Sequence, residues 1–379
     1  MSSGNNSKKL LLVAHISDKC NFQCSYCYSH RSKEDMSVKV IKALASFAKS
    51  LVDNKFYEDI VLAVEGGEPT LDMLQLKKLI KDAKEKKVDE FIVCTNGKKI
   101  NKKMADFFAA NKVYPVISFE SKKPFIMNRA SPDPEAAAKI WHKINDSLIF
   151  FVPYLDSYGH DEMNVFDSIR GRITITPSAI GYLADSVNHL YRSAIGEKVL
   201  ITLMPAMSED LEREWRALAA DKKAVFDLEK QFLEIAKLYL LGLESGRHLN
   251  FCINECISTK FSNLSSSTGL EEVPFCNAGR SLLGVGMKGD IFPCYLLSAA
   301  KQSLFRDAFK IGDVFDGFCK GKEKVIDRFC GKKQNKHFSC LYWNWIANGR
   351  PDKPAIAYSL IFNAWKKAAF HIQKELSKN

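Results

Sequence analysis

Long apolar runs are missing from this chain of 379 residues. No stretch approaches the roughly 18–20 consecutive apolar residues of a membrane-spanning helix. The first apolar run, Leu10 to Ala14, is too short for a secretory signal. We therefore expect a cytoplasmic protein with no membrane partner. The 46% of hydrophobic and 26% of charged residues also exclude a mainly disordered chain.

An arginine-rich block, an internal repeat and a recognisable RNA-binding module are also missing. The 55 lysines and arginines exceed the 44 aspartates and glutamates, which gives a formal net charge of +11. Such a charge favours an anionic partner, such as an acidic peptide, nucleic acid or phosphate groups. Because no RNA-binding module is found, nucleic acid is not the expected partner. A basic but inert surface is the alternative.

A disulfide framework is not expected either, because the eleven cysteines are odd in number and no export signal precedes them. In a reducing compartment, clustered cysteines more often bind metal or carry out redox chemistry. Three of them form an N-terminal triplet, Cys20, Cys24 and Cys27. Seven lie between residues 252 and 340, and Cys94 stands between the two groups.

The first 205 residues alternate short apolar runs with amphipathic helical patterns. This alternation predicts an α/β fold with a parallel sheet, either open or curled into a barrel. Active sites of such folds lie at the C-terminal ends of the strands. The apolar runs are rich in Val, Ile and Phe and lack a clean alternation with polar residues, as expected for strands buried on both faces. The predicted strands are Leu10–Ile16, Ile60–Val64, Phe91–Cys94, Val113–Phe119, Arg172–Thr176 and Leu200–Met204.

The domain organisation is predicted from how this alternation and the composition change along the chain. Residues 1–9 are expected to be a disordered tail, and 10–207 the core barrel. An insertion over about 120–170 interrupts the alternation and is a candidate cover for the active site. Residues 208–250 read as a helical linker. Residues 251–379 form a smaller region rich in cysteine, glycine and phenylalanine, of the kind that often needs a metal to fold.

The first strand runs into the segment Cys20-Asn-Phe-Gln-Cys24-Ser-Tyr-Cys27. Three thiolates spaced C-x3-C-x2-C on one loop can hold three irons of a [4Fe–4S] cluster. The fourth iron then has no protein ligand and is open to a small chelating molecule. Zinc is the alternative, but a structural zinc site uses four ligands and this loop offers three.

This segment resembles the signature of the radical S-adenosylmethionine (radical SAM) enzymes. Further matches follow at the ends of successive strands, in the segments Glu65-Gly66-Gly67-Glu68-Pro69 and Thr95-Asn96-Gly97. Ser118 and Arg172, the latter in an R-x-T-x-T stretch, match positions that contact the cofactor's ribose or carboxylate. The resemblance implies that S-adenosylmethionine is bound by Tyr26, Gly66, Gly67, Glu68, Asn96, Ser118 and Arg172.

The resemblance covers about residues 9–205 and implies a partial (β/α)6 barrel of TIM-like form. It also implies a [4Fe–4S] cluster with one open iron, bound by Cys20, Cys24 and Cys27. In the family, the reduced cluster cleaves S-adenosylmethionine to a 5′-deoxyadenosyl radical that takes hydrogen from a substrate. A reductant such as a flavodoxin or a ferredoxin is then an expected partner.

The C-terminal region resembles SPASM and Twitch domains, which hold auxiliary iron–sulfur clusters. Cys276 and Cys294 stand in a C-x12-G-x4-C pattern, but the later cysteines of the SPASM pattern are eroded. The expectation is therefore one auxiliary [4Fe–4S] cluster, with Cys276, Cys294, Cys330 and Cys340 as ligands. Cys252 and Cys256 are rivals for the last two places, and a region that binds zinc or nothing is the alternative. Cys94 is expected to be buried in its strand.

The SPASM and Twitch branch mostly modifies ribosomally made peptides. The first hypothesis is therefore a peptide maturase that forms a crosslink or a thioether or epimerises a residue. The alternatives are a small-molecule dehydrogenase or mutase, such as one acting on an aminosugar, a formylglycine-forming sulfatase maturase, and a non-catalytic iron–sulfur partner protein. Sulfatase maturases place an aspartate where this chain has Tyr295, which makes Tyr295 a speculative catalytic residue. Because the first strand starts near residue 10, a leader peptide would be bound by the C-terminal region, by the insertion or by a separate protein.

Overall fold

The computed structural model describes eleven stretches of the chain: 9–29, 32–129, 133–157, 168–206, 208–246, 249, 251–253, 259–260, 278–300, 304–330 and 340–378. Cys256 and Cys276, two of the predicted or rival cluster ligands, lie outside these residues, as does the predicted tail up to residue 8. Lys9, which was assigned to the tail, is the first residue of the first strand.

All six predicted strands are confirmed, and they pair in sequence order in one parallel sheet. Leu12 pairs with Leu62 and Leu62 with Phe91, so fully buried apolar side chains run across the sheet. The strands are β1 (Lys9–Ser17), β2 (Asp59–Gly66), β3 (Glu90–Thr95), β4 (Val113–Ser118), β5 (Arg170–Ile175) and β6 (Leu200–Pro205).

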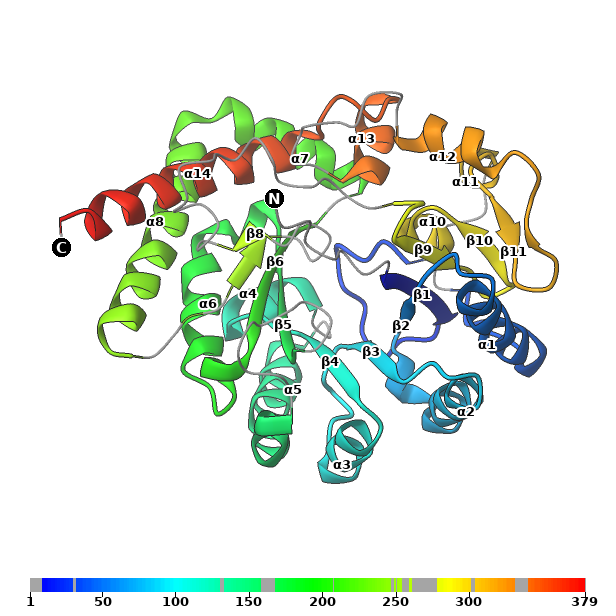
Figure 1. The fold of residues 1–379 in the computed structure, drawn as a ribbon. Coiled ribbons are helices and arrows are strands. Elements are labelled where there is room, and N and C mark those ends of the chain that lie inside the picture. The colour runs from blue at the N-terminus through cyan, green and yellow to red at the C-terminus, as the bar shows by residue number, and fades with distance from the viewer. Residues whose placement is uncertain are drawn as a thin grey trace.

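Helices cover the outer face of this sheet, and Figure 1 shows them arranged as a ring around a partial barrel. The predicted cap of the first helix is confirmed, because the Ser37 side chain accepts a hydrogen bond from the Val40 amide. The helix then buries Ile41, Leu44 and Phe47 against the sheet. The helices of this part are α1 (Val38–Asp53), α2 (Met73–Lys84), α3 (Lys102–Ala110), α4 (Lys122–Arg129), α5 (Pro134–Ser147) and α6 (Leu183–Tyr191), with a 3-10 helix over Leu148–Ser157.

The predicted insertion contains α4, α5 and this 3-10 helix. Phe125 of α4 and Trp141 of α5 pack with Phe22 from the loop after β1, in a small apolar cluster separate from the main core. The rings of Phe22 and Phe125 meet edge to face at 5.8 Å. The insertion therefore packs directly against the loop that carries the cysteine triplet.

Two helices follow β6, namely α7 (Glu209–Ala220) and α8 (Lys222–Glu244). Trp215 of α7 is fully buried, and its indole N–H donates to the carbonyl of Ala206 at 2.9 Å. Helix α8 packs against α6 and against the last helix, α14 (Ile356–Leu376), through contacts such as Phe232 with Trp365. Helix α14 also contacts α7 and β6, so this group of helices lies beside the last of the six strands.

The C-terminal segments extend the sheet at both of its ends. Strand β7 (Phe251–Ile253) pairs in parallel with β6, whereas β9 (Leu282–Val285) pairs in parallel with β1. Figure 1 shows the result, with the yellow and orange elements beside the blue ones. The domain boundary at residue 250 stays a prediction. The remaining elements are β8 (Thr259–Lys260), β10 (Asp290–Phe292), β11 (Gly312–Asp313), β12 (Gly317–Phe318), α10 (Tyr295–Ala299), α11 (Leu304–Asp307), α12 (Lys322–Cys330) and α13 (Leu341–Asn348).

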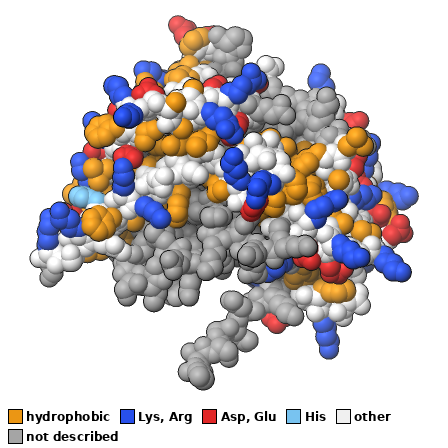
Figure 2. All heavy atoms as spheres, turned by 90° about the horizontal axis from the view of Figure 1, so that it is seen from above, with side chains coloured by type: hydrophobic (Ala, Val, Ile, Leu, Met, Phe, Trp, Pro, Cys, Tyr) orange, Lys and Arg blue, Asp and Glu red, His pale blue; other side chains and the backbone are white. Residues whose placement is uncertain are grey.

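The surface seen from above carries lysine and arginine side chains in many separate places, with acidic side chains among them (Figure 2). On that face the positive charge does not gather in one block. Across the described stretches, none of the helices has the length and apolar character needed to cross a membrane.

Candidate active site

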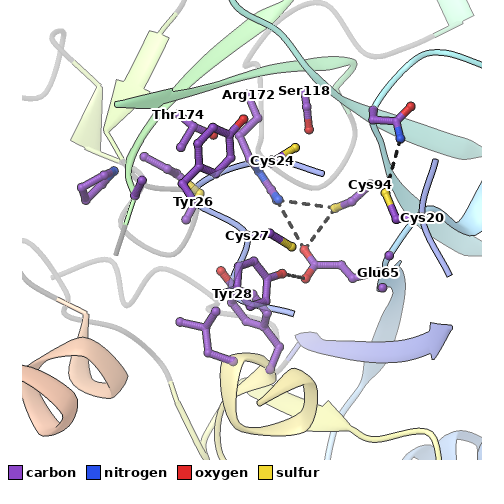
Figure 3. A pocket seen from close by; sticks show the side chains of 18 of the residues that line it. Cys20, Cys24, Tyr26, Cys27, Tyr28, Glu65, Cys94, Ser118, Arg172 and Thr174 are labelled. Carbon is purple, nitrogen blue, oxygen red and sulfur yellow. Dashed lines mark hydrogen bonds and ion pairs between the residues drawn. The ribbon is translucent and has the colours of Figure 1, made fainter. Parts of the chain in front are cut away.

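One cavity lies at the C-terminal ends of the barrel strands. Each of the six strands, or the loop directly after it, contributes side chains to its wall, and β9, α10, α13 and α14 close it from the C-terminal side. Every residue that the sequence assigned to S-adenosylmethionine or to the open cluster lines this cavity: Cys20, Cys24, Tyr26, Cys27, Gly66, Gly67, Glu68, Asn96, Ser118 and Arg172. The lining side chains labelled in Figure 3 come from the loop after β1 and from the strand ends.

The loop that carries the cysteines is held against the end of β2 by close backbone contacts. The amide of Gly67 donates to the carbonyl of Ser17 at 2.6 Å, and the amide of Glu68 donates to that of Lys19 at 2.7 Å. A Cβ atom at Gly67 would lie 2.2 Å from the Lys19 carbonyl oxygen. Gly66 has a backbone φ of +147°, which residues other than glycine rarely adopt. Both glycines therefore allow β2 to approach the cysteine loop.

The three cysteines share the cavity wall, and burial raises the pKa of two of them. Burial is the main cause for Cys20, and it raises the pKa of Cys24 to about 11 although the nearby Arg129 opposes it. No three His, Cys, Asp or Glu side chains among the described residues surround a single metal ion. Thiolates of a [4Fe–4S] cluster each bind a different iron, so they need not converge on one point. The described residues thus offer no three-ligand site for one zinc ion, and the three thiols stay the predicted ligands of a cluster.

Glu68 is 1% exposed, and its carboxylate is satisfied within the protein. It accepts hydrogen bonds from the Thr95 hydroxyl at 2.8 Å and from the Asn96 amide at 2.6 Å, as well as from the amide of Thr70 at 3.1 Å. Burial raises the pKa of Glu68, and these hydrogen bonds oppose the rise. The carboxylate thus ties the end of β2 to the end of β3, in addition to facing the cavity.

Arg172 is paired with Glu65, a residue to which the sequence analysis gave no role. The guanidinium Nη2 lies 3.4 Å from the Glu65 carboxylate and 3.5 Å from the Cys94 sulfur. Glu65 also accepts hydrogen bonds from Tyr28 and from Cys94, each at 3.1 Å (Figure 3). The prediction that Cys94 is buried within its strand is wrong, because it is partly exposed and lines the cavity. Cys94 is the next-to-last residue of β3, directly before the Thr95-Asn96-Gly97 segment. This position at the C-terminal end of a strand was the signal in the sequence that it lies at the site.

Tyr26 is anchored by a buried ion pair. Its hydroxyl donates to Glu120 at 2.9 Å, and the Glu120 carboxylate pairs with the Arg129 Nε at 3.1 Å. Arg129 also donates to the carbonyl of Ser118 at 3.3 Å. The ring of Tyr26 is thereby held at the cavity wall, next to the end of β4.

The structure brings only part of the predicted auxiliary set together. Cys294 and Cys340 are buried and line the same cavity. Cys330 is not among its lining residues, and its thiol donates to the carbonyl of Ala278 at 3.3 Å. Burial raises the pKa of Cys330 to about 11. Tyr295, directly after Cys294, also lines the cavity.

Comparisons with known proteins point to one family. The model for the radical SAM superfamily matches residues 15–148. An S-adenosylmethionine-dependent nucleotide dehydratase of Psychrobacter lutiphocae is 27% identical over 117 residues, which cover 28% of this chain and 38% of that protein. A cysteine-type anaerobic sulfatase-maturating enzyme of Clostridium perfringens is 28% identical over 123 residues, or 30% of this chain and 33% of that protein. The matches thus span about a third of the length of these curated relatives.

Solved structures share the fold over nearly the whole chain. The structure of anSMEcpe with bound AdoMet and the Cp18Cys peptide has a TM-score of 0.64 at 16% identity, and the match covers 98% of this chain and 99% of that one. Streptococcus suis SuiB bound to the precursor peptide SuiA has a TM-score of 0.57 at 17% identity, covering 93% and 76% of the two chains. At these identities the likeness concerns the fold, and it extends through the C-terminal region.

Proposed function

We propose that this chain, whose residues 15–148 match the radical SAM superfamily, is a peptide-modifying member of that superfamily with a cluster bound by Cys20, Cys24 and Cys27. The observation that carries the proposal is the single cavity, which contains the cysteine triplet, the ends of all six strands and side chains of the C-terminal region. When bound, the cluster and S-adenosylmethionine supply 5′-deoxyadenosyl radical chemistry. The protein binds them, positions the substrate and excludes water.

We assign different residues of the cavity to different parts of S-adenosylmethionine and of the cysteine loop. Arg172 is the positive group that we assign to the carboxylate of S-adenosylmethionine, and Glu65 orients its guanidinium. Gly66 and Gly67 let the backbone of β2 approach the cysteine loop. The Tyr26 ring, held by Glu120, is assigned to the adenine side. Each thiol that binds iron must lose its proton, so cluster binding opposes the high pKa that burial gives Cys24.

The peptide substrate is supported by the likeness of fold, over almost the full chain, to structures that hold peptides. A second candidate is a small-molecule enzyme, because two of the relatives are named nucleotide dehydratases. An auxiliary [4Fe–4S] cluster at Cys294 and Cys340 remains part of the proposal, whereas Cys330 lies outside the cavity that these two share.

The central test is reductive cleavage of S-adenosylmethionine by the anaerobically reconstituted protein. Under dithionite we expect formation of 5′-deoxyadenosine, measured by mass spectrometry. Replacing Cys20, Cys24 and Cys27 by Ala should abolish it and remove about four irons. Cys319→Ala, which changes an exposed cysteine outside the cavity, is the matched control. Cleavage by the triple variant would refute the proposal.

The substrate class is tested with the loaded enzyme and the peptide encoded beside its gene. A change in the mass of that peptide, dependent on S-adenosylmethionine, supports a maturase. Consumption of a nucleotide instead, with no change in the peptide, supports the second candidate.

A further inference from the structure

The cavity has two chemically different halves. The half formed by the loops and ends of β1 to β5 and by the end of α4 contains the cysteine triplet and every charged lining residue that the structure describes. The other half is formed by the end of β6 and by β9, α10, α13 and α14. Its uncharged side chains are Met204, Leu282, Tyr295, Leu296, Trp343 and Tyr358, and we call this wall the apolar half. Cys294 and Cys340, the proposed ligands of an auxiliary cluster, line the cavity on the same side.

The charged lining residues are already engaged with one another or with neighbours. Arg129 pairs with Glu120, and Arg172 pairs with Glu65 and is assigned to the carboxylate of S-adenosylmethionine. Glu68 accepts three or more hydrogen bonds from nearby groups. No lysine is among the described lining residues. An anionic substrate group would therefore find no uncommitted cation in the described part of this wall.

The apolar half is built from side chains that are held in place. Leu282, Leu296 and Tyr358 are each less than 5% exposed. Trp343 and Tyr295 are also buried, and their polar atoms are confined to one indole N–H and one hydroxyl. Burying a charged group here would cost its hydration, and none of the described lining side chains of this half is a lysine, arginine, aspartate or glutamate that could supply a counter-charge. Burying an apolar side chain would instead be favourable in proportion to its area.

We infer that the substrate residue that enters this cavity is uncharged and either apolar or aromatic. This inference rests on the proposed function. The apolar half is continuous with the half that we assign to the cofactor, because both belong to one cavity. A peptide would thus present a residue such as leucine or phenylalanine to the reacting site. A nucleotide, whose phosphates need cationic or amide donors, fits this wall poorly.

The inference is tested by binding, on the cluster-loaded protein saturated with S-adenosylmethionine. The probes are the N-acetyl amides of leucine, phenylalanine, aspartate and lysine, together with CTP, and dissociation constants are measured by calorimetry or ligand-observed NMR. The leucine and phenylalanine amides should bind about tenfold or more tightly than the charged amides and CTP, because only they gain from burial. Equal or tighter binding of a charged probe, or no binding of the apolar amides, would overturn the inference.

Helix α10 offers a matched pair of variants. Leu296 and Leu297 are both buried, but only Leu296 lines the cavity. Leu296→Lys should weaken the apolar amides about tenfold and strengthen the aspartyl amide. Leu297→Ala should lower stability and leave the ratio of affinities unchanged. An unchanged ratio in Leu296→Lys would contradict the assignment of this wall.

The same samples separate this inference from the proposed function. Formation of 5′-deoxyadenosine without any amide depends on the cofactor half alone. If it fails while the apolar amides still bind preferentially, the proposed function is wrong and the apolar half stands. If it succeeds while charged probes bind as well as apolar ones, the proposed function stands and the inference falls.

Discussion

The buried pair Glu120–Arg129 supports a sharp prediction, because its two members respond differently to loss of the partner. Both side chains are about 2% exposed or less. Glu120 follows β4, and Arg129 is the last residue of α4, so the pair joins the insertion to the barrel. Through the Tyr26 hydroxyl it also joins both to the cysteine loop. Trp141 donates to the Glu120 carbonyl at 2.9 Å and can report on the site by fluorescence.

Replacing Glu120 by Leu leaves the Arg129 guanidinium buried without a counter-charge. A guanidinium does not lose its proton in a protein, so the full penalty of about 3–5 kcal/mol is expected. The variant Arg129→Met instead leaves the Glu120 carboxyl group buried without its partner. Burial raises the pKa of Glu120, so it can bind a proton and become neutral. The loss of stability should therefore be smaller in Arg129→Met.

The sign of the pH dependence follows from the same argument. In Arg129→Met the folded state must hold a proton on Glu120 that the unfolded state releases, so its stability should fall as pH rises above the usual carboxyl range. In Glu120→Leu no such proton exists, and the loss should be nearly independent of pH between about 6 and 8.

The assay is urea unfolding of the apoprotein, followed by tryptophan fluorescence at two pH values. The double variant Glu120→Leu/Arg129→Met should regain most of the stability, because replacing both partners of a buried pair by apolar residues is often close to neutral. Asp227→Asn breaks the exposed pair with Lys223 and is the control, with no measurable change expected. A loss below about 1 kcal/mol in Glu120→Leu would refute the reasoning.

Three further predictions concern separate parts of the chain. Gly67→Ala should prevent stable cluster assembly, measured as iron content, because its Cβ would lie 2.2 Å from the Lys19 carbonyl oxygen; normal iron content would show that the loop can shift. Cys294→Ala should lower the iron of the reconstituted protein from about eight to about four per chain, while Cys330→Ala leaves it near eight; the reverse pattern would move the auxiliary site. Burial raises the pKa of Glu212 above its usual value of 4.5, so the folded state binds its proton more tightly and this group's contribution to stability falls as pH rises. Glu212→Gln should therefore flatten the pH dependence of the unfolding free energy between pH 4 and 8, and an unchanged slope would contradict the shift.

The sequence by itself determined the elements and the contiguous motif. The six strands lie where apolar runs predict them, because strands buried on both faces are rich in Val, Ile, Leu and Phe. The Ser37 cap is local chemistry between a side chain and an amide three residues away. Cys20, Cys24 and Cys27 share one loop, so their proximity needs no knowledge of the rest of the fold.

Only the tertiary structure decided which distant residues meet. Strand β9 lies beside β1 although some 270 residues separate them, and this pairing carries Cys294 to the cavity of Cys20. Cys330 has the same side chain as Cys294 but is not among the residues that line the cavity, since its thiol lies against the carbonyl of Ala278. The pairing of Arg172 with Glu65 likewise depends on neighbouring strand ends. Local patterns report the burial and period of a segment, whereas these contacts depend on the path of the chain and on how its layers pack.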